Sequence, residues 1–120
     1  MVDLLEEIYA ALKTIPDAEQ VNYQYPQDWA TLPAVTYYEQ SNTEMRVFGG
    51  SNYMANVSYQ IDIWAKMPEQ CRVIAYNVDD RMAALGLRRE FSADLFDPSG
   101  IHHRSMRYAG KYNPATNIIY

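Results

Sequence analysis

The sequence predicts an α+β fold, with two helices packed on one face of an antiparallel sheet of four to five strands, in the order α-β-β-α-β-β. Three observations predict it. Apolar residues recur at three- and four-residue steps in two segments, they alternate with polar residues between positions 34 and 66, and turn-forming residues mark two hairpins. The 120 residues, 48% hydrophobic and 21% charged, suit one globular domain, so residues 1–120 are predicted to form a single unit.

The first helix is predicted over residues 3–14. Asp3 and Glu6 have the spacing of a capping box, and Pro16 ends the helix. Residues 22–33 contain prolines and a tryptophan among polar residues, so we expect a loop that is held down by aromatic side chains. The apolar stripe of the helix consists of Leu4, Leu5, Ile8, Leu12 and Ile15.

Alternation then predicts the first hairpin. Residues 34–40 and 52–66 are expected to be strands, and Gly49-Gly50 between them is a hairpin turn signal. In the second strand the apolar face consists of Tyr53, Ala55, Val57, Tyr59, Ile61 and Ile63.

The register of this hairpin follows from its apolar residues. A strict two-residue turn would leave Val35 and Tyr37 out of line with the apolar face of the second strand. A shift by one residue reverses every side chain, so we predict a bulge near residues 41–43 or a three-residue loop at the glycines. Either would pair Val35 with Ile63 and Tyr37 with Ile61.

The same hairpin is longer than the core of a small domain can cover. Its second strand would run for about 14 residues, whereas strands in compact domains usually have about 3 to 10. Part of the hairpin should therefore overhang, and exposed apolar side chains there would need a partner to cover them. The predicted interface on this arm consists of Met45, Arg46, Val47, Phe48 and Tyr53.

The second helix is predicted to begin at Pro68 and to end at Gly86. Residues 87–96 and 101–112 flank the turn-forming tetrapeptide Asp97-Pro98-Ser99-Gly100 and should form a second hairpin. The apolar stripe of the helix consists of Cys71, Ile74, Ala75, Val78, Met82 and Leu85.

Charge and composition disfavour several classes of function. The net charge of −5 and the pI of about 4.8 oppose binding to nucleic acid, because phosphate contacts need clustered Lys and Arg. No apolar stretch approaches the roughly 20 residues that cross a bilayer, so no membrane partner is expected. With a single cysteine and no secretory signal, the chain is expected in a reducing cytoplasm.

The sequence predicts no catalytic, metal or cofactor site. His102 and His103 are the only pair that suggests one, but neighbours on a strand point to opposite faces and cannot easily share a metal. No nucleophile-elbow, phosphate-loop, dinucleotide or zinc motif occurs. We therefore do not expect an enzyme.

The remaining reactive residues have structural explanations. Cys71 lies on the apolar stripe of the second helix, where a thiol acts as a small buried hydrophobe. Asp97 fits the turn better than a metal site. Glu39, Asp62 and Glu90 are single carboxylates on strands and are expected to be solvated.

A family resemblance covers about residues 3–112. Its features are the segment Leu32-Pro33-Ala34-Val35-Thr36-Tyr37-Tyr38, a variable polar arm, the long strand that ends in residues 59–66, a helix opening at Pro68, and a closing hairpin. In this order they resemble the tail terminator, or tail completion, proteins of long-tailed bacteriophages, including the lambda-type minor tail proteins.

The resemblance implies a structural protein of a phage or prophage. Such a subunit closes into a ring of six on the head-proximal end of the tail tube, stops tube polymerisation and joins the tail to the head. The implied partners are further copies of the chain, the tail tube protein and the head–tail connector protein, with no cofactor. The implied location is the virion tail, assembled in the host bacterial cytoplasm. The arm at residues 42–51 takes the position of the family's variable loop, which implies contacts with neighbouring subunits or the tube.

Two alternatives remain open at this point. Another component of the head–tail neck would share nearly all of the sequence evidence. A small-molecule-binding or hydrolytic domain would use His102, His103 and Glu90 instead.

Overall fold

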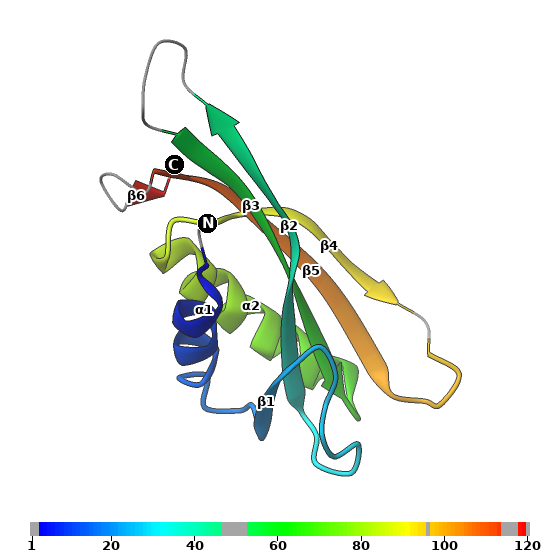
Figure 1. The fold of residues 1–120 in the computed structure, drawn as a ribbon. Helices are drawn as coiled ribbons and strands as arrows, with labels where there is room; N and C mark the ends of the chain where they lie inside the picture. The colour runs from blue at the N-terminus through cyan, green and yellow to red at the C-terminus, as the bar shows by residue number, and fades with distance from the viewer. Residues whose placement is uncertain (1–2, 47–52, 96, 114–117, 120) are drawn as a thin grey trace.

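The computed structural model describes residues 3–46, 53–95, 97–113 and 118–119, which form one mixed sheet with both helices on one of its faces (Figure 1). The elements in chain order are α1 (Leu5–Leu12), β1 (Gln20–Tyr23), β2 (Ala34–Arg46), β3 (Tyr53–Ala65), α2 (Pro68–Ala84), β4 (Arg88–Leu95), β5 (His102–Asn113) and β6 (Ile118–Ile119). The strand order is β1-β2-β3-β5-β4, and β6 pairs with the end of β5. None of the described helices is both long and apolar enough to span a membrane.

The α+β class is confirmed, but the prediction of an antiparallel sheet in the order α-β-β-α-β-β is wrong. β1 runs parallel to β2, from the pair Gln20–Ala34 to the pair Tyr23–Tyr37, and β6 adds a further short strand. β1 has four residues with one buried side chain, that of Val21, which is too short for alternation to reveal. Parallel strands usually need a connection of about a dozen residues. Residues 24–33 suffice here because β1 is so short.

Hydrogen bonds from Gln20 hold the loop between β1 and β2. Its Nε2 donates to the carbonyl oxygens of Asp28 and Thr31, both at 2.6 Å. The Asp28 carboxylate accepts hydrogen bonds from the Thr31 hydroxyl at 2.7 Å and from the Ala30 amide at 2.9 Å, and these bonds lower its pKa. The loop therefore has a defined shape, but it begins at residue 24 and not at residue 22 as predicted, because Asn22 and Tyr23 belong to β1.

Both helices lie where they are predicted, but α1 is two residues shorter at each end than the predicted range 3–14. The N-cap of α1 is Leu4, and the capping box predicted for Asp3 and Glu6 is wrong: no side chain caps the helix, and Asp3 accepts a hydrogen bond from the amide of Leu5. For α2 the prediction is confirmed. Pro68 lies in its first turn, and the positive φ of Gly86, 90°, terminates it.

The hairpin of β2 and β3 has the predicted register. Val35 pairs with Ile63 and Tyr37 with Ile61, and the pairing shifts by one residue between Glu39 and Ser41. The bulge thus lies just before the predicted range. It keeps the apolar side chains on the helix side, which is the physical reason for predicting it. The Gly49-Gly50 turn lies outside the described residues.

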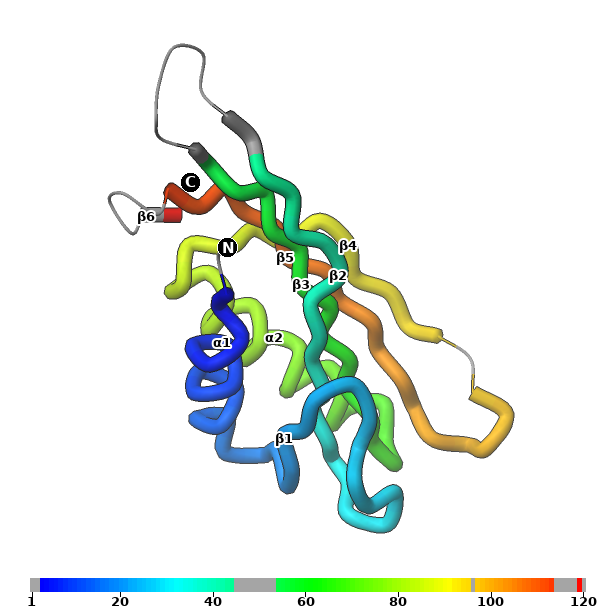
Figure 2. Tube along the Cα trace, in the orientation of Figure 1, coloured from blue at the N-terminus to red at the C-terminus, as the bar shows by residue number. Residues whose placement is uncertain are grey.

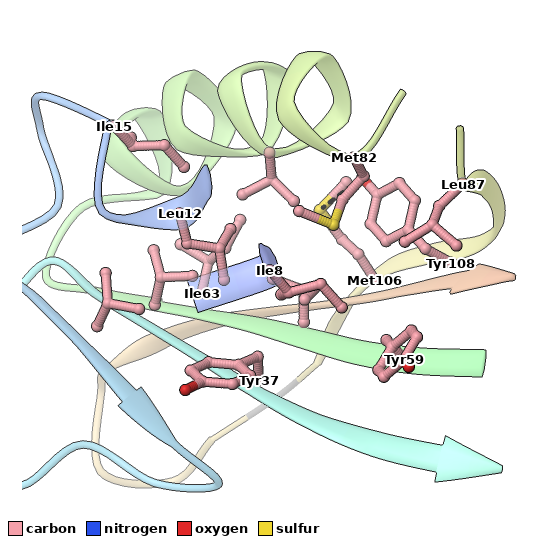
Figure 3. Packing of buried hydrophobic residues seen from close by; sticks show 14 of the residues in the cluster. Ile8, Leu12, Ile15, Tyr37, Tyr59, Ile63, Met82, Leu87, Met106 and Tyr108 are labelled. Carbon is pink, nitrogen blue, oxygen red and sulfur yellow. Dashed lines mark hydrogen bonds between the residues drawn. The ribbon is translucent and has the colours of Figure 1, made fainter. Parts of the chain in front are cut away.

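The core fills the space between the helices and one face of the sheet. Side chains of α1 and α2, among them Ile8, Leu12 and Met82, point toward Ile63 and Met106 of the sheet (Figure 3). All five are at most 2% exposed. The face of the sheet that points away from α1 and α2, here called the outer face, has no helix over it (Figure 1).

Replacement of Ile61 by Ala should test how much of the stability comes from this core. Ile61 is fully buried on β3, so the substitution leaves a cavity and should lower the free energy of unfolding by about 2–5 kcal/mol. Thr43→Ala on the same hairpin is the matched control, because Thr43 is exposed, and its effect should stay within about 0.5 kcal/mol. Urea denaturation measures both. Equal effects would contradict this account of the core.

Alkaline pH should destabilise the protein through two buried acids. Burial raises the pKa of the Cys71 thiol to about 11, from an ordinary value of 9.0, and that of the Tyr59 phenol to about 12. Below pH 9 the thiol keeps its proton in both the folded and the unfolded chain, so its contribution is complete. Above this pH the unfolded chain releases the proton first, and the free energy of unfolding should fall as the pH approaches 11.

Urea midpoints measured at stepped pH values check this expectation. Cys71→Ala removes the thiol, so the stability advantage of the unaltered chain over the variant should narrow between pH 9 and pH 11. A constant difference across this range would contradict the assignment of the thiol as a buried, neutral group.

Candidate functional site

Polar and aromatic side chains gather on the outer face, where β3 and β5 lie side by side. Asp62 pairs across the strands with Ser105, and Trp64 pairs with His103. A hollow of about 550 Å³ lies over them, here called the Asp62 hollow. Its lining also includes Gln24, Tyr25, Tyr38, Gln40, Gln60, Leu95 and Arg107.

Asp62 and His103 form a half-hidden pair in this hollow. The distance from His103 Nε2 to Asp62 Oδ1 is 2.8 Å, and the two side chains are 15% and 10% exposed. Gln60 donates from its side-chain amide to the same carboxylate oxygen at 3.3 Å, and also to the hydroxyl of Ser105. The expectation that Asp62 is solvated is therefore wrong. Polar residues on a face without a helix are buried here by one another and by neighbouring aromatic rings.

Two tryptophans lie beside the Asp62–His103 pair, one packed against the histidine ring and the other packed against the first tryptophan. The imidazole of His103 stacks on the indole of Trp64, with ring centroids 3.7 Å apart and planes tilted by 14°. Trp29, in the loop between β1 and β2, meets Trp64 edge-on at 5.1 Å. The indole N–H of Trp64 donates to the hydroxyl of Thr36 at 3.0 Å. Together these contacts fix the plane of the histidine ring.

Tyr38 lies at the wall of the Asp62 hollow. Burial raises the pKa of its phenol, and the nearby carboxylate of Asp62 adds to this shift. The phenol therefore stays protonated near neutral pH and can donate a hydrogen bond.

The residues proposed for a hydrolytic alternative do not converge. His103 faces the Asp62 hollow, whereas His102 lies on the other side of β5 and is exposed, as the alternation of the strand predicts. Glu90 lies on β4 and lines a different hollow. In the described part of the chain the Ser105 hydroxyl bonds to Gln60 and makes no bond to His103, so no nucleophile–base relay is formed there.

The structure also tests the roles predicted for Cys71 and Asp97. Cys71 is 3% exposed and its thiol faces the carbonyl oxygen of His102 at 3.4 Å, which confirms it as a buried small hydrophobe. Asp97 accepts a hydrogen bond from the amide of Ser99 at 2.9 Å, which lowers its pKa and confirms its turn role. No cluster of three or more His, Cys, Asp or Glu that could hold a metal occurs among the described residues.

A second hollow, of about 490 Å³, also lies on the outer face and is lined by cationic side chains. Arg88, Arg107 and Lys111 line it, together with Glu90, and it is here called the cationic hollow. Arg107 belongs to both hollows, and its guanidinium lies over the ring of Phe91 at 5.4 Å. Sequence reasoning missed this cluster because its members come from β4 and β5. These cations lie at alternate positions of two paired strands, and this pattern is the sequence signal that could have revealed the cluster.

The predicted interface residues lie on the hairpin arm. Met45 pairs with Met54, and Arg46 pairs with Tyr53, so the ladder continues to the last described residues of both strands. Val47 and Phe48 lie outside the described residues. Figure 2 shows that this end of β2 and β3 extends beyond both helices.

No protein-family model matches the chain, and no curated protein matches it in sequence.

Asp62→Ala should show that this carboxylate is structural. It removes the acceptor for both His103 and Gln60 in a nearly closed network, so the free energy of unfolding should drop by about 1–3 kcal/mol. Glu90→Ala is the matched control, since Glu90 is also a single carboxylate on a strand but is exposed. Thermal and urea unfolding measure the difference. A drop for both variants, or for neither, would count against the network.

Proposed function

We propose that this protein is a structural subunit of a phage or prophage tail, of the tail-terminator type. In this role it closes into a ring of six on the head-proximal end of the tail tube, ends tube polymerisation and joins the tail to the head. Its partners are copies of itself, the tail tube protein and the head–tail connector protein. Its place is the virion tail, after assembly in the host bacterial cytoplasm.

The observation that carries the proposal is the hairpin arm. β2 and β3 have 13 residues each, whereas α2, the longer helix, has 17. At typical rises the strands span about 43 Å and the helix about 26 Å, so the strands outrun the layer that covers them. The radius of gyration agrees, at 15.4 Å compared with about 14 Å for a compact domain of this length.

An arm of this kind is suited to assembly. β5 pairs with β3 as far as Ala55, and beyond that residue the described ladder of β2 and β3 has two strands only. Such a ribbon presents strand edges to its surroundings. A ring needs two different patches that meet on neighbouring subunits. The outer face supplies one of these patches, and the arm adds to the contacts between neighbours.

The dispersion of the candidate catalytic residues also supports a structural role. His102 and His103 point to opposite sides of β5, and the histidine that faces the outer hollow is already bonded to Asp62. Contacts rather than chemistry are therefore the function that this surface suits best.

Shortening the arm tests the proposal. Replacement of residues 45–54 by Asn-Gly joins Glu44 to Ala55 through a two-residue turn, and these residues pair in the ladder, so the register is kept. The variant should fold with a nearly unchanged melting temperature but should no longer assemble. Light-scattering mass and electron microscopy of the protein mixed with tail tubes measure assembly.

A matched control replaces residues 96–102, at the other hairpin turn, by the same dipeptide, which joins the paired residues Leu95 and His103 and keeps their register. This variant should still cap tubes. Normal capping by the shortened arm would contradict the proposal. Binding to the connector without binding to tubes would point to another neck component instead.

A further inference from the structure

The five Lys and Arg residues of β4 and β5 divide into two groups by face. On the helix side Arg89 pairs with Asp79 at 2.8 Å, and Arg104 pairs with Asp94 at 2.9 Å. On the outer face the three cations of the cationic hollow make no ion pair within the described part of the chain. The chain has 15 Asp and Glu for 10 Lys and Arg, yet within the described residues no carboxylate pairs with these three outer-face cations.

Arg107 indicates that this surface is partly buried and is not only a set of solvated charges. Its guanidinium is half-buried against Phe91, and its Nε is buried without a hydrogen-bond partner. A buried donor of this kind costs free energy unless an acceptor reaches it. Phe91, which pairs with Arg107 across β4 and β5, is 39% exposed and adds apolar surface beside the charges.

A complementary surface lies in the helix layer. Asp17, Glu19 and Glu69 surround a hollow of about 390 Å³ between the end of α1 and the start of α2, here called the acidic hollow. None of the three makes an ion pair within the described residues. Val73 at its edge is 48% exposed, so this surface also combines charge with apolar area.

We infer that the cations around the cationic hollow of one copy contact the carboxylates around the acidic hollow of the next copy, an inference that rests on the proposed ring. The two surfaces belong to different layers of the fold, one to the outer face and one to the helix side, so they are distinct patches of one molecule. Contact between distinct patches is heterologous, which is the type of contact that generates rings. Nucleic acid is the weaker choice of partner, because the remaining surface is acidic and repels phosphate.

Charge reversal tests this contact. Arg88→Glu with Lys111→Glu alters two exposed cations and leaves the half-buried Arg107 in place. The dissociation constant for self-association, measured by sedimentation, should rise about tenfold or more, because attraction becomes repulsion at two positions. In the unaltered protein, association should weaken as NaCl increases from about 0.1 M to about 1 M.

Rescue makes the test specific. Glu19→Lys with Glu69→Lys should weaken association to a similar extent, and mixing this variant with the cation-reversed one should restore it. A variant that had merely misfolded would not be rescued. Lys66→Glu, an exposed cation outside both hollows, is the control and should associate normally.

The outcomes separate this inference from the proposed function. If rings form and all charge variants join them normally, the inference is overturned while the ring proposal stands. If cation reversal abolishes binding to a short DNA duplex and leaves association intact, the surface serves nucleic acid and the inference is likewise overturned. If the unaltered protein forms no ring, alone or on tubes, the proposed function fails.

Discussion

The structure depends on one strand that is buried along both faces. From Val57 to Ala65 every residue of β3 is buried, with apolar side chains toward the helices and polar or aromatic ones toward the outer face. The two faces impose different requirements. The helix side needs volume, whereas the outer side needs a hydrogen-bond partner for each polar group, and Gln60, Asp62 and Ser105 meet that need among themselves. The register of both neighbouring strands follows from this double constraint.

Much of the fold could be predicted because the apolar face of β3 is a strong signal. Alternation required Val35 opposite Ile63, and either a bulge or a three-residue loop allows that, so the pairing could be derived from the sequence alone. β1 could not be found in this way, since its four residues contribute only Val21 to the core and it is placed by backbone pairing with β2. Backbone pairing of so short a strand leaves no periodic trace in the sequence.

The polar contacts of the outer face were far less predictable, because they join residues that lie far apart in the sequence. Asp62 looks like any solvated carboxylate in the sequence, because its partner His103 is 41 residues away and the rings that shelter it come from a loop and from β3 itself. The arm, by contrast, could be anticipated from strand length alone. A residue count predicts that the strands extend farther than the helices that cover them. It does not predict which polar side chains contact one another.

The extra residue at Gln40 has a geometric consequence for any assembly. A bulge coils the ribbon more tightly at that point, and it lies just after the part of β2 that pairs with β1. The direction of the described ribbon between the bulge and the pair Arg46–Tyr53 is therefore set by the backbone of the subunit itself. In a closed ring, the angular step from one member to the next would then be encoded in part by a single inserted amino acid.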